Sequence, residues 1–196
     1  MARRDARRYR RKGLDKTARL IVDRLVEQGV SDATVLEVGG GVGAIEIELL
    51  KAGAKEATVV ELSEEYDHEA SELLVENRLD ERVVRRHGDF VEVGGEVEPA
   101  DVVVMHRVVC CYPDPDALIG LAGSHARRLL ALSFPRETWW VRFGWYAVDL
   151  WFRLVYRFES YVHAHARILG AAARAGFTPV YQHSGRLWHV AVLERR

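Results

Sequence analysis

Short apolar runs alternate along this chain with segments in which apolar residues recur at helical spacing. The runs are bounded by Gly, Asp or Pro, and their lengths of about four to eight residues are typical of buried strands. We expect strands at residues 34–38, 57–62, 83–87, 101–105, 128–133, 177–183 and 187–193. Because helical patterns fill most of the intervals, the sequence predicts an α/β fold with a mostly parallel sheet and helices on both faces.

The last two runs are separated only by Ser184, Gly185 and Arg186. A connection this short joins antiparallel neighbours, whereas parallel strands need a longer crossover. We therefore expect a seven-stranded sheet closed by one antiparallel strand. Residues 91–99, between the third and fourth strands, are rich in Gly and Glu, so the crossover there should be short.

Capping residues mark the starts of several helices. Asp15 can cap a helix that ends at Gly29, and Asp114 followed by Pro115 can begin another. A further helical pattern spans residues 64–77.

A glycine-rich turn follows the first strand. Gly39, Gly41 and Gly43 let the backbone turn tightly and leave a surface without Cβ atoms, and the positive end of the next helix faces it. This arrangement suits a nucleotide-type cofactor. The dinucleotide fingerprint is also matched here, by Gly39, Gly41 and Ala44, with the acidic Glu61 ending the second strand.

Glu37, two residues before the first glycine, extends the pattern to E-x-G-x-G-x-G. A carboxylate there suits a cofactor with a positive ammonium group and opposes one that carries pyrophosphate. With this motif the chain resembles the class I S-adenosylmethionine (SAM) dependent methyltransferases. That resemblance implies a Rossmann-like sheet and SAM as the cofactor.

The resemblance also implies roles for residues at the strand ends. Glu61, with Leu62 beside it, would hold the ribose hydroxyls. Asp89, in the Gly-Asp pair after the third strand, would accept from the adenine amino group, and the apolar Phe90 would cover the ring. His106, after the fourth strand, would line the cofactor pocket.

Length and composition narrow the function classes. A chain of 196 residues suits a single domain over 1–196 and leaves no room for the second domain that a dehydrogenase usually adds. The net charge of −1 demands no nucleic acid. Two adjacent cysteines, with no signal peptide or long apolar span, lead us to expect a cytoplasmic protein.

The N-terminal region, residues 1–30, combines a basic arm with the first capped helix. Residues 2–16 contain eight Arg and Lys against two Asp. The arm could touch anionic lipid, RNA or an acidic substrate, or form a solvated helix face or a mobile arm. In the methyltransferases that this chain resembles, such a region often folds over the cofactor, which makes Tyr9 a residue of interest.

An aromatic insertion, residues 136–160, follows the fifth strand. Of the chain's 18 aromatic residues, 11 fall between Phe134 and Tyr161, including four of its five tryptophans. Such a surface leaves three uses open besides extra core: a lid over a flat apolar substrate, an in-plane membrane anchor, or a homodimer interface. Arg142, Asp149 and Arg153 oppose a membrane span, and we expect a helical cap.

The candidate catalytic residues are His163, His106 and Tyr112, with Tyr161 nearby in sequence. The element F-x-x-Y-x-H before the last helix resembles the magnesium-protoporphyrin O-methyltransferase group, which favours oxygen over nitrogen or carbon as the methyl acceptor. The loop after the fourth strand lacks the (D/N)-P-P-(Y/F) motif, which counts against DNA bases as substrates. No His, Cys and carboxylate cluster predicts a metal.

Together these features predict transfer of a methyl group from SAM to a small, largely apolar molecule. The alternatives are a SAM-binding scaffold without activity and an NAD(P)-dependent oxidoreductase.

Overall fold

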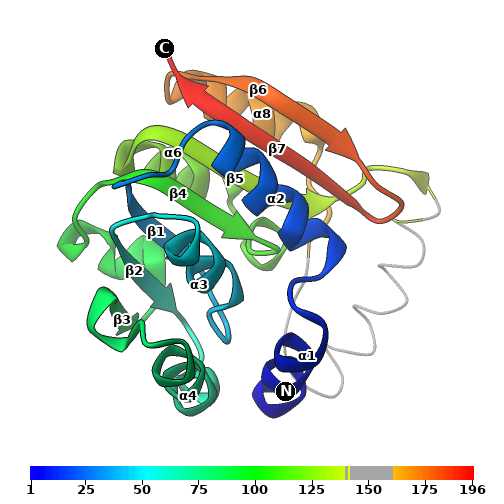
Figure 1. Ribbon diagram of the computed structural model, residues 1–196. Helices are drawn as coiled ribbons and strands as arrows, with labels where there is room; N and C mark the ends of the chain where they lie inside the picture. The colour runs from blue at the N-terminus through cyan, green and yellow to red at the C-terminus, as the bar shows by residue number, and fades with distance from the viewer. Residues whose placement is uncertain (140, 142–160) are drawn as a thin grey trace.

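The computed structural model describes residues 1–139, 141 and 161–196, and its centre is one seven-stranded sheet (Figure 1). The strands lie in the order β3-β2-β1-β4-β5-β7-β6. Their bounds are β1 Thr34–Val38, β2 Glu56–Glu61, β3 Val83–His87, β4 Ala100–His106, β5 Ala126–Pro135, β6 Phe177–Ser184 and β7 Trp188–Arg195. Only β7 runs antiparallel to its neighbours β5 and β6. The expected sheet is therefore confirmed.

Helices cover both faces of this sheet. The α-helices described are α1 Ala2–Lys12, α2 Lys16–Glu27, α3 Ala44–Lys51, α4 Asp67–Asn77, α5 Phe90–Val93, α6 Pro115–His125 and α8 His165–Arg174. Short 3₁₀ turns are η1 Glu64–Tyr66, η2 Asp80–Arg82, η3 Gly94–Glu96 and η4 Val109–Cys111. The expected aromatic cap, residues 136–160, lies almost wholly outside the described residues.

Two apolar clusters hold the layers together. Along β4, Val102 and Val104 point to the face covered by α1 to α4, while Val103 and Met105 point to the face covered by α5, α6 and α8. All four side chains are fully buried. This continuous apolar run is what a strand buried on both faces requires.

The strand order reverses beside β1, and this reversal determines where a ligand can bind. From β1 the chain adds β2 and then β3 on one side, and after β3 it crosses to place β4 on the other side. In open α/β sheets, ligands bind beyond the carboxyl ends of the strands at such a switch point. The glycine turn after β1 lies there.

Most local predictions hold at the level of elements. Asp15 accepts from the backbone N–H groups of Thr17 and Ala18, and Asp114 accepts from that of Asp116, so both expected caps are confirmed. The crossover between β3 and β4 contains only the four-residue α5 and the turn η3, as its composition indicated. The expected helix over residues 64–77 is divided into η1 and α4.

Candidate active site

The glycine turn is held in place by its neighbours. Gly39, Gly41 and Gly43 all have positive φ angles, of 70°, 56° and 83°. A Cβ atom on Gly39 would lie only 2.5 Å from the side chain of Val108, so the loop after β4 packs directly onto the turn. The turn and that loop therefore form one unit at the carboxyl ends of β1 and β4.

Glu37 lies beneath this turn and is only 2% exposed. Its Oε2 accepts from the backbone N–H of Glu46 at 3.0 Å, at the start of α3. Burial, followed by the adjoining carboxyl of Glu46, raises the pKa of Glu37 well above its usual range. A protonated Glu37 can donate to Glu46, and Arg85 lies 3.5 Å from Glu46 Oε1.

Glu37 therefore contacts the protein interior. We expected it to face the positive group of a cofactor, but its observed partners are Glu46 and the first turn of α3. Its geometry supports a role in joining the glycine turn to the helix.

Glu61, at the end of β2, points at the same turn. Its Oε2 accepts from the N–H of Gly41 at 2.8 Å, and its Oε1 accepts from the N–H of Ser63 at 3.0 Å. The ring of Tyr66 lies over Gly41, where a Cβ atom would be 3.7 Å from it. Burial, with nearby Asp5 and Glu61, raises the pKa of Tyr66. Sequence reasoning included Tyr66 only in the helical pattern over residues 64–77 and missed this position.

The residues after β2 and β3 differ in exposure. Leu62 is 64% exposed, so it presents an apolar surface beside Glu61. Asp89 accepts from the N–H of Val91 through Oδ1 at 2.9 Å and thereby caps α5. Phe90 is only 3% exposed and packs edge-on against the ring of His125, 5.4 Å between centroids. Its ring therefore packs in the core, and the expected contact with an adenine stays a prediction.

His106 ends β4 and is held from both sides. Ser133 Oγ accepts from the backbone N–H of Arg107 at 3.0 Å and lies 2.9 Å from His106 Nδ1. His106 Nε2 faces Asp15 Oδ2 at 3.9 Å, and a carboxylate can only accept, so the imidazole proton lies on Nε2 and Nδ1 accepts from the Ser133 hydroxyl. Burial lowers the pKa of His106, so the ring is neutral near pH 7.

Asp15, His106 and Ser133 are the three residue types of a hydrolase triad. Ser133, however, is fully buried. A nucleophile must reach its substrate, so this hydroxyl cannot act as one. Asp15 also lies 2.9 Å from Arg107. These contacts of Asp15 connect the start of α2 to the end of β4. Only the capping role of Asp15 could be anticipated from the sequence.

The other catalytic candidates gather on the loop after β4. The N–H of Tyr161 donates to the carbonyl of Cys110 at 2.7 Å, and His163 Nε2 lies 2.8 Å from the carbonyl of Tyr112. The rings of Tyr161 and His163 stack with centroids 5.7 Å apart. Burial and nearby Asp89 raise the pKa of Tyr112. The structure thus brings Tyr112, Tyr161 and His163 together beside Asp89.

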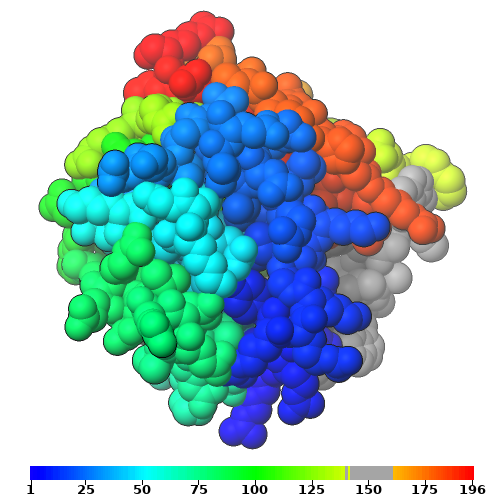
Figure 2. Space-filling model, viewed as in Figure 1, coloured from blue at the N-terminus to red at the C-terminus, as the bar shows by residue number. Residues whose placement is uncertain are grey.

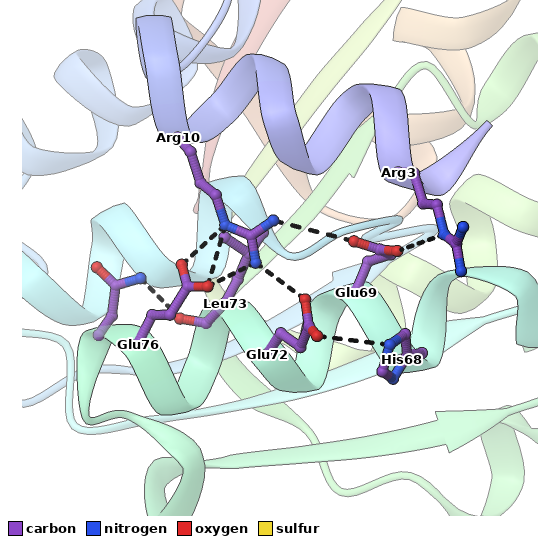
Figure 3. Close-up of polar contacts among 8 residues, drawn as sticks. Arg3, Arg10, His68, Glu69, Glu72, Leu73 and Glu76 are labelled. Atoms are coloured by element: carbon purple, nitrogen blue, oxygen red, sulfur yellow. Dashed lines mark hydrogen bonds and ion pairs between the residues drawn. The ribbon is translucent and has the colours of Figure 1, made fainter.

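The N-terminal arm is a helix packed against α4 (Figure 2). Arg10 contacts Glu69, Glu72 and Glu76 of α4, and Arg3 contacts Glu69 (Figure 3). Tyr9 donates to Glu48 Oε1 of α3 at 2.6 Å.

A cavity of about 400 Å³ opens between α1, α3 and α4. Tyr9, Glu48, Lys51 and Leu73 are among its lining residues, and none of the strand-end residues contributes to it. This hollow therefore lies apart from the candidate site.

Neither a metal site nor a membrane span is found in the part of the chain that the structure describes. There, no three His, Cys, Asp or Glu side chains are grouped in a way that could hold a metal ion. No helix in the same part is long and apolar enough to cross a bilayer.

Comparison with known proteins decides the class. A family described as "Methyltransferase domain" matches residues 6–182, which is most of the chain. The chain belongs to this methyltransferase family. Its activity class is SAM-dependent methyl transfer, as the motif around the glycine turn indicated, and the oxidoreductase alternative is excluded.

Solved structures show the same fold as this methyltransferase. Magnesium protoporphyrin IX methyltransferase from Synechocystis PCC 6803, with bound S-adenosylhomocysteine (SAH), is 24% identical. Its TM-score is 0.74, and the match covers 92% of this chain and 83% of that one.

Two further similar structures have names that indicate different atoms as the methyl acceptor. An O-methyltransferase family protein from Burkholderia thailandensis is 19% identical, with a TM-score of 0.71 and coverage of 91% and 56%. N,N-8-amino-8-demethyl-D-riboflavin dimethyltransferase from Streptomyces davawensis is 22% identical, with a TM-score of 0.62 and coverage of 91% and 55%. A search of curated protein sequences found no match.

Proposed function

We propose that this methyltransferase binds SAM across the glycine turn, with the ribose on Glu61 and the adenine beside Asp89. The observation that carries the proposal is the meeting of Gly41, Glu61, Tyr66 and Asp89 at the carboxyl ends of β1 to β3. Each oxygen of Glu61 accepts one backbone hydrogen bond and keeps a further lone pair, which suits two neighbouring hydroxyls. Leu62, exposed beside Glu61, supplies apolar contact.

The residues present fit such a cofactor. A Cβ atom on Gly41 would meet only the ring of Tyr66, at 3.7 Å, so among the described residues no backbone and no other side chain crowds the turn there. Gly43 caps α3, whose amino end is positive. When bound, SAM supplies an electrophilic methyl group on a sulfonium. The protein's part is to hold an acceptor in line with that group, and such positioning can supply much of the rate.

We place the acceptor beside η4, where Tyr112, Tyr161 and His163 meet. If His163 donates from Nε2 to the carbonyl of Tyr112, its Nδ1 is left as an acceptor and can take a proton from a hydroxyl. A carboxylate acceptor needs no base. His106 is neutral and fully engaged with Ser133 and Asp15, which favours a positioning role.

The substrate that we propose is a small, largely apolar molecule methylated on oxygen. The aromatic insertion supports the apolar part, and the F-x-x-Y-x-H element at Phe158, Tyr161 and His163 supports oxygen. The names of the similar structures include both O- and N-directed enzymes. Assays with labelled SAM and panels of phenols, apolar carboxylates and amines test whether oxygen or nitrogen accepts the methyl group. Turnover of amines alone would overturn the oxygen assignment.

Calorimetry with SAH tests the cofactor site. Glu61→Gln should weaken SAH binding by about tenfold or more, because the ribose hydroxyls lose a charged acceptor, whose hydrogen bonds contribute about 1.5–3 kcal/mol. Glu64→Gln, three residues away and exposed, is the matched control and should bind as the wild type does. A folded Glu61→Gln variant with unchanged affinity would show that the ribose is placed wrongly.

A further inference from the structure

The chain's only cysteines, Cys110 and Cys111, are adjacent and lie in η4. Their sulfur atoms are 3.8 Å apart, and both lie near the carbonyl of Arg107, at 3.4 and 3.5 Å. Cys110 is buried whereas Cys111 is exposed. The pair therefore places an exposed thiol beside a buried one.

This pair lies at the meeting point of the two halves of the site. Val108, in the same loop, packs on Gly39, and Glu61 is close enough to act electrostatically on the Cys111 thiol. On the other side, the carbonyl of Cys110 accepts the hydrogen bond from Tyr161. A change at these sulfurs therefore affects both the glycine turn and the segment that leads to His163.

The two thiols differ in reactivity. A hydrogen bond from the Cys110 thiol lowers the pKa of Cys111, and the same contact with burial raises that of Cys110. The thiolate is the reactive form of cysteine, so Cys111 is the attacking group. Cys110 lies close enough to attack the Cys111 sulfur once that sulfur carries a bound group.

We propose that Cys110 and Cys111 form a thiol-oxidation site that reversibly blocks cofactor binding at the glycine turn, an inference that rests on the placement of SAM proposed above. The oxidant is a small disulfide. The Cys111 thiolate attacks one of its sulfur atoms and releases the other as a thiolate. Cys110, after losing its proton, then attacks the Cys111 sulfur and releases the second thiolate. The two cysteines are oxidised, and the small disulfide is reduced to two thiols.

Closing this bond must alter η4. The sulfurs must approach from 3.8 Å to about 2.0 Å. Neighbouring Cα atoms are about 3.8 Å apart, below the usual disulfide range of about 4.4–6.8 Å. The turn must therefore change conformation, moving Val108 on the glycine turn and the carbonyl that holds Tyr161. A disulfide of this kind is readily reduced, which makes the block reversible.

The test compares SAH affinity by calorimetry in reduced protein, in protein treated with oxidised glutathione, and in treated protein reduced again with dithiothreitol. We expect affinity to fall about tenfold or more on oxidation, equivalent to about 1.4 kcal/mol, and to return on reduction. Mass spectrometry should show loss of two hydrogen atoms from the wild type. Saturating SAH should slow the modification, because it covers Cys111.

Two variants separate the roles of the thiols. Cys110→Ala should retain one glutathione on Cys111, because no second thiol can displace it, and Cys111→Ala should remain unmodified. The SAH affinity of each reduced variant is its own reference, and circular dichroism checks that it folds.

Equal SAH affinity in the reduced and oxidised wild type would overturn the inference and leave the cofactor site standing. Modification at a rate that SAH does not change would also overturn it. Failure of the reduced protein to bind SAH would overturn the proposed cofactor site, and this inference with it.

Discussion

At the scale of single residues, the buried carboxyl pair beneath the glycine turn makes stability depend on pH. Glu37→Gln imitates protonated Glu37, because its amide can donate to Glu46 and accept from the N–H of that residue. A raised folded pKa gives stability that is complete below the unfolded value of about 4.3 and is lost as pH rises through the folded pKa. The variant should therefore gain stability relative to the wild type as pH rises.

Urea unfolding at about pH 5 and about pH 8 measures this gain, which should be larger at the higher pH. Glu48→Gln is the control. Burial raises the pKa of Glu48, but the hydrogen bonds from Tyr9 and Lys51 and the charges of Lys51 and Arg19 together lower it more. A depressed pKa affects stability only below the unfolded value of about 4.3, so the difference between Glu48→Gln and the wild type should stay constant between about pH 5 and about pH 8. A constant difference between Glu37→Gln and the wild type across this range would contradict the assignment.

The same pair shows why residue roles were only partly predictable. That Glu61 and Asp89 lie near the glycine turn follows from their place at the ends of neighbouring parallel strands. The partners of Glu37 do not follow, because Glu46 contacts it and Arg85 acts on it electrostatically through a spatial arrangement that periodicity does not encode. The contact of Phe90 does not follow either: the helix that begins at Phe90 turns its ring into the core against His125.

At the scale of elements, Asp15 combines a helix cap with an ion pair. Asp15→Asn should keep the cap of α2 but lose the attraction to Arg107, at a cost of about 1 kcal/mol. Asp15→Ala should cost about 1 kcal/mol more, because the cap is lost as well. Thermal and urea unfolding of both variants measure the difference. Equal stability of the two would show that the cap contributes nothing.

Acid conditions separate the two contributions further. Burial raises the pKa of Asp15, but hydrogen bonds from His106 and Ala18 and the charge of Arg107 lower it more. The stability from a depressed pKa is present above the unfolded value of about 3.9 and is lost as pH falls through the folded pKa. The gap between the wild type and Asp15→Asn should therefore be constant near neutral pH and narrow in acid.

The elements themselves were predicted better than their ends. Each apolar run became a strand, since alternate residues such as Val102 and Val103 must be buried on opposite faces. β5 was expected over residues 128–133 but extends from Ala126 to Pro135, because β4 and β7 supply partners for its extra residues. Such extension depends on neighbouring strands that a single run of sequence does not reveal.

At the scale of the whole molecule, α1 determines how one side of the candidate site is covered. Asp5 of α1 acts electrostatically on Tyr66, which lies over Gly41, so the helix reaches the edge of the glycine turn. Arg10 and Tyr9 fix its other end to α4 and α3. The order of this helix should therefore influence cofactor binding from a distance.

Arg10→Ala tests this coupling. Removing the contacts with Glu72 and Glu76 should speed hydrogen exchange in α1 and cleavage near Gly13 by a factor of a few. SAH binding should weaken modestly, because Tyr66 loses part of its cover. Both differences between Arg10→Ala and the wild type should become smaller in high salt, because salt screens the ion pairs of Arg10 in the wild type.

Arg7→Ala is the matched control, since it removes one positive charge from the same helix. Arg7 is exposed and has no ion pair in the described part of the chain. It should exchange and bind SAH as the wild type does. Equal weakening in both variants would mean that the charge of α1 attracts the cofactor. Faster exchange in Arg10→Ala with unchanged SAH affinity would instead show that α1 is independent of the site.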